Sequence, residues 1–163
     1  IVLLTALIQT TTAQKGFKSK STPSGILETP INPLALTITS GATFVAQSFA
    51  GDALHMISMI KAGIQHKGFS IINILQPCVT FNKINTYQYY LQRVYKLDEN
   101  YKNNNFEIAV KKSLEMNEEK FPLGIIYQVE KPSYTDQLSQ LKENTLVDKK
   151  RFTDFDKITN LFI

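Results

Sequence analysis

The residue with the most distinctive chemistry in this sequence is Cys78, its only cysteine. It lies in Leu75-Gln76-Pro77-Cys78-Val79-Thr80-Phe81-Asn82, directly after an apolar run that is typical of a buried strand. A lone cysteine at the end of a strand is most often a small, packed hydrophobic side chain. Its neighbours indicate a more defined turn, because Pro77 stiffens the chain and Thr80 and Asn82 can hydrogen-bond to nearby backbone. One cysteine also excludes an internal disulfide framework.

The other side chains that can do chemistry are scattered. His55 lies off the apolar stripe of its predicted helix, and His66 comes at the end of that helix, where positive charge is favourable. Neither has a nucleophile close by in sequence, so a Cys–His or Ser–His hydrolase is not indicated. The acidic pairs Glu118-Glu119 and Asp154-Asp156 lie in polar stretches typical of solvated surface. The sequence has no glycine-rich phosphate loop and no His/Cys metal spacing, and we predict no catalytic residue.

Capping residues and apolar runs before Cys78 predict half of a parallel α/β sheet. Asn32-Pro33 supplies an N-cap and a proline at the first helical position, and Asp52 is a good N-cap for the strongest helix. One apolar stripe of that helix consists of Ala53, Met56, Ile57, Ile60 and Ile64. The expected elements are a strand (1–8), a long loop (10–33), a short helix (33–40), a strand (43–46), a helix (53–66) and a strand covered on both faces (69–75).

The pattern changes after Cys78. Residues Thr86–Leu97 predict an amphipathic helix, with Tyr87, Tyr90, Leu91, Val94 and Leu97 on one side. A more charged helix over Phe106–Met116 and a strand over Gly124–Val129 follow. From Gln137 onward the chain is polar and weakly helical. We therefore expect an α/β part over residues 1–76 and a small α+β extension over residues 77–163, in which residues 136–163 form a polar tail.

The composition is that of an ordinary folded protein, since 43% of the 163 residues are apolar and 20% are charged. The net charge of +4 is mildly basic, but the basic runs carry no interleaved aromatic residues, so nucleic-acid binding is not indicated. No apolar run approaches the roughly 20 residues that span a bilayer. Residues 1–8 mimic the core of a secretory signal but lack an initiator Met and a basic residue before it. We expect these residues to belong to a strand and the protein to be cytoplasmic.

Short blocks of residues in a fixed order run from about residue 15 to residue 135. These blocks are Lys20-Ser21-Thr22-Pro23-Ser24-Gly25, Gly41-Ala42-Thr43-Phe44-Val45-Ala46, Phe49-Ala50-Gly51-Asp52, His66-Lys67-Gly68-Phe69-Ser70, Pro77-Cys78-Val79-Thr80-Phe81-Asn82, Asn85-Thr86-Tyr87, Arg93-Val94-Tyr95-Lys96-Leu97 and Pro122-Leu123-Gly124-Ile125-Ile126-Tyr127-Gln128-Val129-Glu130-Lys131-Pro132. Together they resemble the C-terminal part of the β subunit of two-subunit 2-oxoacid:ferredoxin oxidoreductases of the pyruvate/2-oxoglutarate type. Many blocks in the right order are far more specific than any one of them.

The resemblance implies that residues 1–76 are the C-terminal portion of a thiamine-diphosphate-binding domain. It implies oxidative decarboxylation of a 2-oxo acid to an acyl-CoA, with electrons passed through a 4Fe–4S cluster to ferredoxin. In this family a cysteine in the Pro-Cys-Val-Thr-Phe-Asn turn is one ligand of that cluster, so Cys78 is the expected metal ligand. Thr80 and Asn82 can then bond to cluster sulfurs as well as to backbone. The implied cofactors are thiamine diphosphate, magnesium and the 4Fe–4S cluster. The implied partners are an α subunit, ferredoxin, the 2-oxo acid and coenzyme A.

The sequence also departs from the family pattern. It contains no Gly-Asp-Gly stretch of the kind that binds the diphosphate, and Gly51-Asp52 is better explained as a helix start. Near the beginning only Leu4-Thr5 match the family's turn, so we assign no cofactor-binding residue there. A cubane cluster needs about four ligands, and one cysteine supplies one. We therefore expect the isolated chain to be inactive. The alternative is a non-catalytic interaction module or decayed fragment in which Cys78 is merely packed.

Overall fold

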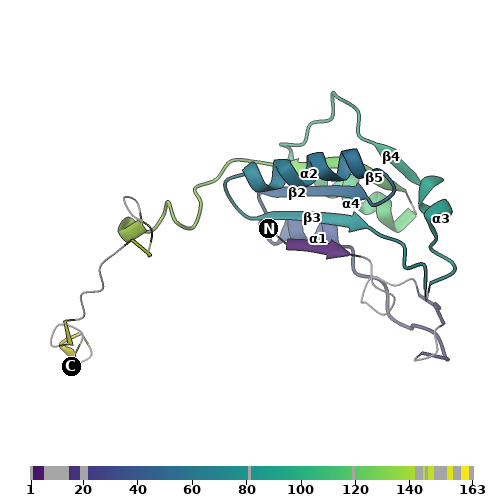
Figure 1. The fold of residues 1–163 in the computed structure, drawn as a ribbon, viewed down its shortest axis with the longest axis horizontal. Helices are drawn as coiled ribbons and strands as arrows, with labels where there is room; N and C mark the ends of the chain where they lie inside the picture. Colours follow the sequence, from purple (N-terminus) through teal and green to yellow (C-terminus); the bar gives the residue numbers. More distant parts are fainter. Residues whose placement is uncertain are drawn as a thin grey trace. The chain divides into compact units, whose positions relative to one another are not determined.

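The computed structural model describes residues 2–5, 15–18, 22–80, 82–118 and 120–141, together with residues 145, 147–148, 154–155 and 159–161 (Figure 1). The chain divides into two compact units, residues 1–131 and residues 132–163. The first unit contains every strand that the structure describes. The second contains a short 3₁₀ helix, η2 (Ser139–Leu141), in the stretch predicted to be weakly helical.

The first unit is built on a five-stranded sheet with the strand order β1-β3-β2-β5-β4. Its strands are β1 (Val2–Thr5), β2 (Phe44–Phe49), β3 (Ser70–Leu75), β4 (Val94–Lys96) and β5 (Phe121–Gln128). Strand β3 pairs in parallel with both β1 and β2, as the sequence predicts for the first half. Strand β5 runs antiparallel to β2, and β4 is parallel to β5. The mixed α/β fold is thus confirmed, and the sheet continues past Cys78 into the predicted extension.

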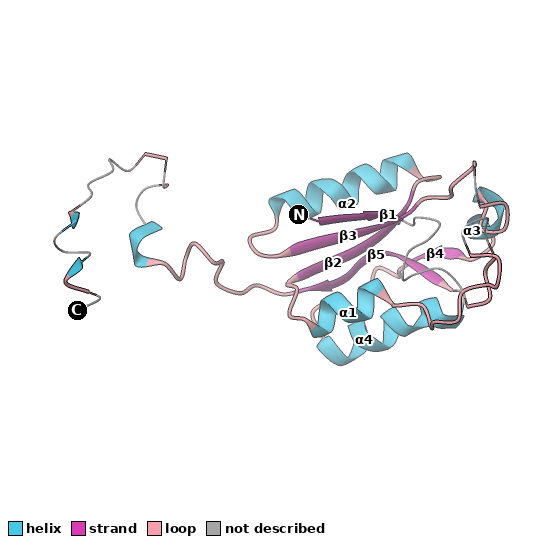
Figure 2. Ribbon diagram, turned by 90° about the horizontal axis from the view of Figure 1, so that it is seen from below, coloured by secondary structure: helices cyan, strands magenta, loops and turns pink. Residues whose placement is uncertain are grey.

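Helices cover both faces of this sheet (Figure 2). Helix α2 (Ala53–Gln65) lies on one face, and α1 (Pro33–Thr39) and α4 (Phe106–Leu114) lie on the other. All six residues of β2 and all six of β3 are buried, which confirms the prediction of a strand covered on both faces. Burial of one large apolar side chain contributes about 1.5–3 kcal/mol, so these two strands supply much of the core.

The caps predicted from sequence are confirmed. The side chain of Asn32 accepts a hydrogen bond from the Ala35 N–H at 3.1 Å, and the Asp52 carboxylate accepts one from the His55 N–H at 3.1 Å. Asn32 also donates from its amide to the carbonyl of Ser113 at 2.7 Å. The cap of α1 therefore also ties that helix to the end of α4.

The predicted apolar stripe of α2 is only partly correct. Met56 and Ile60 pack on the sheet, but Ile57 and Ile64 are 47% and 65% exposed. The helix instead meets the sheet at Gly63, where an added Cβ would come within 2.7 Å of the Ile72 side chain. The small residue lets the helix approach closely and turns the contact face away from Ile57 and Ile64.

The prediction of one helix over Thr86–Leu97 is correct only for the first part of that range. Helix α3 spans only Tyr87–Leu91, and Val94–Lys96 form β4. The Arg93 carbonyl accepts from the Phe121 N–H at 3.0 Å, and the Leu97 N–H donates to the Leu123 carbonyl at 2.9 Å. These bonds to β5 compensate for the helical bonds that are lost. The apolar residues of β4 continue the helical spacing of α3, because the strand follows directly after the helix. The whole stretch therefore resembled one helix in the sequence.

The remaining elements lie close to their predicted places. Helix α4 ends at Leu114 and passes into the 3₁₀ helix η1 (Glu115–Glu118). Strand β5 begins at Phe121, earlier than predicted, and so includes Pro122. The division predicted between residues 76 and 77 stays a prediction. No helix in the described part of the chain is long and apolar enough to cross a membrane.

Candidate iron–sulfur ligand turn

Cys78 lies in the turn that follows β3, a central strand with a parallel neighbour on each side. Gln76 is exposed, Pro77 is buried and Cys78 is half-buried. The Ala50 N–H donates to the Leu75 carbonyl at 3.0 Å, so β2 and β3 end side by side. In open α/β sheets, ligands bind outside the carboxyl ends of parallel strands. The thiol therefore lies at the edge of the sheet where a cofactor is expected.

The turn after Cys78 is organised by Asn82. The Asn82 N–H donates to the Cys78 carbonyl at 3.2 Å. Its side-chain oxygen accepts from the N–H groups of Ile84 and Asn85, each at 2.9 Å, and its amide donates to the Asn85 side chain at 2.9 Å. The Lys83 ammonium donates to the Val79 carbonyl at 2.6 Å. The contacts of Asn82 therefore lie within the turn, as the sequence allowed.

A group of aromatic side chains packs together near the end of the sheet where β2 and β3 finish. Phe49, Tyr90 and Phe121 are buried, and the Tyr90 and Phe121 rings are 5.3 Å apart. The Arg93 guanidinium lies 4.0 Å from the centre of the Tyr89 ring. Burial raises the pKa of Tyr90 to about 12. A helix as short as α3 is not stable by itself, so the packing of its aromatic residues holds it in place.

The two histidines have structural partners. His55 Nδ1 is 3.1 Å from the hydroxyl of Ser48, which is fully buried, and His66 Nε2 is 2.9 Å from the Thr43 hydroxyl. Burial lowers the pKa of His55, which favours the neutral ring. The Asp52 carboxylate bonds to the backbone of His55 and not to its ring, so Ser48, His55 and Asp52 do not form a nucleophilic triad.

Asp52 is also the partner of Lys96, whose ammonium lies 2.9 Å from the carboxylate. The hydrogen bond from Lys96 holds the pKa of Asp52 below its usual range. This contact joins the start of α2 to β4. Of the predicted surface acids, Asp154 is exposed, whereas Glu119 and Asp156 lie outside the described residues.

The donor chemistry of the turn fits one corner of an iron–sulfur site. A thiolate is the ligand that iron–sulfur clusters use. The described residues hold no group of three or more His, Cys, Asp and Glu side chains placed for a metal ion. Since the whole sequence has one cysteine, a cubane cluster would need its other ligands from outside this chain.

Sequence reasoning missed a buried polar seam on the face that carries α1 and α4. The Asn73 amide donates to the Gln47 side-chain oxygen at 2.7 Å, and the Gln47 amide donates to the Pro122 carbonyl at 2.9 Å. Gln47 is fully buried and Asn73 is 6% exposed. Gln47 and Asn73 stand out as amides within two mostly apolar strands, which was the available signal, but the network joins residues of three separate strands.

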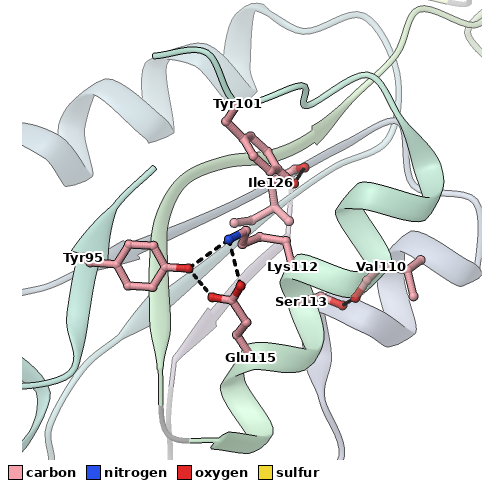
Figure 3. Close-up of polar contacts among 7 residues, drawn as sticks. All are labelled: Tyr95, Tyr101, Val110, Lys112, Ser113, Glu115 and Ile126. Carbon is pink, nitrogen blue, oxygen red and sulfur yellow. Dashed lines mark hydrogen bonds and ion pairs between the residues drawn. The ribbon is translucent and has the colours of Figure 1, made fainter. Parts of the chain in front are cut away.

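A second missed network joins β4, α4 and η1 (Figure 3). Tyr95 donates from its hydroxyl to Glu115, and the Lys112 ammonium lies 2.7 Å from Glu115 and 3.2 Å from the Tyr95 hydroxyl. Tyr101 donates to the Ile126 carbonyl at 2.9 Å. The spacing of Lys112 and Glu115 was visible in the sequence, but Tyr95 was assigned to a helix.

From the network of Tyr95, Lys112 and Glu115 we predict that the free energy of unfolding decreases in acid. Burial disfavours the charged form of Glu115, but hydrogen bonds from Lys112 and Tyr95 outweigh it and hold its pKa below the usual range. Because the pKa of Glu115 is lower in the folded state than in the unfolded state, its ionised form stabilises the protein. This stabilisation is fully present above the unfolded-state pKa of about 4.3 and is lost as the pH falls through the folded-state pKa. Glu115→Gln should cost about 1–2 kcal/mol at pH 7 and flatten the fall in the free energy of unfolding as the pH drops below about 5. Urea titrations across that range measure both effects, and an unchanged slope would contradict the prediction.

Comparisons with known proteins identify the relatives of this chain. Residues 78–143 match the profile of the C-terminal family of the pyruvate ferredoxin oxidoreductase beta subunit. The chain is 41% identical over 139 residues to the 2-oxoacid:ferredoxin oxidoreductase subunit beta of Sulfolobus sp, covering 78% of the chain and 45% of that protein. It is 42% identical over 139 residues to the corresponding protein of Saccharolobus solfataricus, covering 77% of the chain and 45% of the relative.

A comparison with solved structures finds a protein of the same family. The fold matches a chain of the 2-oxoglutarate:ferredoxin oxidoreductase of Magnetococcus marinus, solved with 2-oxoglutarate, coenzyme A and succinyl-CoA bound, with a TM-score of 0.79 and 32% identity. The match covers 93% of this chain and 51% of that one. The chain thus spans about half the length of the relatives it matches. It belongs to the β-subunit family of the 2-oxoacid:ferredoxin oxidoreductases and corresponds to the C-terminal part of that subunit.

Proposed function

We propose that this chain is the C-terminal part of an enzyme subunit that oxidatively decarboxylates a 2-oxo acid to an acyl-CoA and passes electrons to ferredoxin. The observation that carries the proposal is the position of Cys78 at the carboxyl end of a parallel strand, at the first residue of the family match. Cys78 supplies one thiolate ligand of a 4Fe–4S cluster. When bound, that cluster would accept and release single electrons.

The chain's own residues have supporting roles. Strand β3 and the buried Pro77 fix where Cys78 leaves the sheet, and Asn82 holds the following turn. No residue is assigned to thiamine diphosphate or magnesium, because the Gly-Asp pair at residues 51 and 52 caps α2. The proposed partners are an α subunit, ferredoxin, the 2-oxo acid and coenzyme A, and the proposed location is the cytoplasm. The relatives' names support the α subunit and ferredoxin, and the Magnetococcus complex supports coenzyme A.

The activity is tested with the complete β subunit and its α subunit, produced together under anaerobic conditions. We expect reduction of ferredoxin that requires both a 2-oxo acid and coenzyme A. The isolated 163-residue chain should show no activity above background, because it has one cysteine and no Gly-Asp-Gly stretch. Thiamine-dependent decarboxylation by the isolated chain would contradict its expected inactivity. A complete, cofactor-loaded enzyme that reduces no ferredoxin with any 2-oxo acid would contradict the function.

A further inference from the structure

The backbone of Cys78 is fixed from both sides by its neighbours. On one side Pro77 is buried and its ring restricts the backbone. On the other side the Asn82 N–H donates to the Cys78 carbonyl at 3.2 Å. A residue held at both ends has little freedom left to redirect its side chain. The backbone that carries the Cys78 thiol is therefore held in place before any iron binds.

Asn82 can do this because its own side chain is held in place. Its oxygen accepts two backbone N–H groups at 2.9 Å, from Ile84 and Asn85, and its amide donates to the Asn85 side chain. Three hydrogen bonds to a half-buried carboxamide fix both its position and that of its backbone N–H. The sequence left open whether Asn82 contacts cluster sulfurs or backbone, and these contacts favour the backbone role.

We propose that Asn82 is a positioning residue for the iron–sulfur cluster, acting through Cys78. The inference rests on the proposed function, since it requires Cys78 to be a ligand. A thiolate carried by a backbone that is already held in place loses less conformational entropy on binding than one in a mobile turn. Residues that orient metal ligands typically change metal affinity by about 10–100-fold when they are replaced. Asn82 has the contacts of such a residue.

The test uses the complete enzyme, reconstituted anaerobically, with three variants. Asn82→Ala removes the three hydrogen bonds that the Asn82 side chain makes within the turn. Asn82→Asp keeps the oxygens that accept the N–H groups of Ile84 and Asn85 and is the rescue variant. Lys83→Met removes the neighbouring bond to the Val79 carbonyl and leaves Asn82 intact, so it is the matched control. The readout is the rate at which a chelator removes iron, followed by the visible absorbance of the cluster.

We expect Asn82→Ala to lose iron about tenfold faster than the wild type, whereas Asn82→Asp and Lys83→Met stay within about twofold. In Asn82→Asp the added negative charge should also move the midpoint potential of the cluster to a lower value. Wild-type iron loss in Asn82→Ala would overturn the proposal. Equal acceleration in Lys83→Met would overturn it as well, because the effect would then belong to the turn as a whole.

The two proposals fail in different ways. If Cys78→Ser keeps a normal cluster, the ligand assignment fails, and the role of Asn82 fails with it. If Cys78→Ser loses the cluster while Asn82→Ala keeps it with wild-type kinetics, only the positioning role is overturned. Should Asn82→Ala fail to fold, Asn82→Ser takes its place, because a serine hydroxyl accepts the turn N–H bonds more weakly. Iron loss by Asn82→Ser should then be intermediate, and a wild-type rate would overturn the proposal.

Discussion

Cys78→Ser in the complete enzyme is expected to abolish the iron–sulfur cluster or to lower its iron and sulfide content severely. Serine has nearly the same shape, so the half-buried site should still pack. Its oxygen is a poor substitute for the thiolate that iron in a 4Fe–4S cluster prefers. Iron and sulfide are counted after anaerobic reconstitution, in parallel with the visible absorbance, and ferredoxin reduction should fall with them.

The matched control is Val79→Ala, because Val79 follows Cys78 directly and is 67% exposed. It changes the same turn without touching the thiol, and we expect wild-type iron and sulfide. Unchanged cluster content in Cys78→Ser would mean that the thiol is only a packed side chain. That result would favour the interaction module, the alternative left open by the sequence.

Sequence alone predicted the elements whose signals are local. Asn32, Asp52 and the unbroken apolar run before Cys78 each determine structure through neighbours a few residues away. The boundary between α3 and β4 could not be found in this way, because Val94 and Leu97 continue the apolar spacing of the helix. The pairing that decides it is made with Phe121 and Leu123, far along the chain.

The same limit applies to the candidate site. Cys78 and Asn82 were visible because they share one short turn, whereas the direction of the Asn82 bonds depends on how the turn closes. The antiparallel pairing of β5 with β2 and the register shift in this pairing at Val45 and Ala46 were not predictable from periodicity. Both features follow from contacts between strands, for which the sequence carries no local signal.

Gln47→Met is expected to destabilise the chain by about 2–4 kcal/mol, although methionine fills nearly the same volume. The substitution leaves the buried Asn73 amide and the Pro122 carbonyl without the bonds that Gln47 makes to them. Each buried polar group left without a partner costs about 1–3 kcal/mol. Gln47 lies between Val45 and Phe49, which belong to separate apolar groups of the core, so its bonds hold β3, β2 and β5 together between those groups.

The double variant Gln47→Met with Asn73→Leu should recover part of this loss, because removing both partners of a buried pair costs less than removing one. The remaining cost belongs to the Pro122 carbonyl. Gln65→Met is the control, since Gln65 is exposed at the end of α2 and its replacement should stay within about 0.5 kcal/mol of the wild type. Urea unfolding of the wild type and these variants, with Asn73→Leu alone to complete the cycle, measures the coupling. Strict additivity of the two substitutions would show that the bond between Gln47 and Asn73 contributes nothing to the stability of the sheet that carries Cys78.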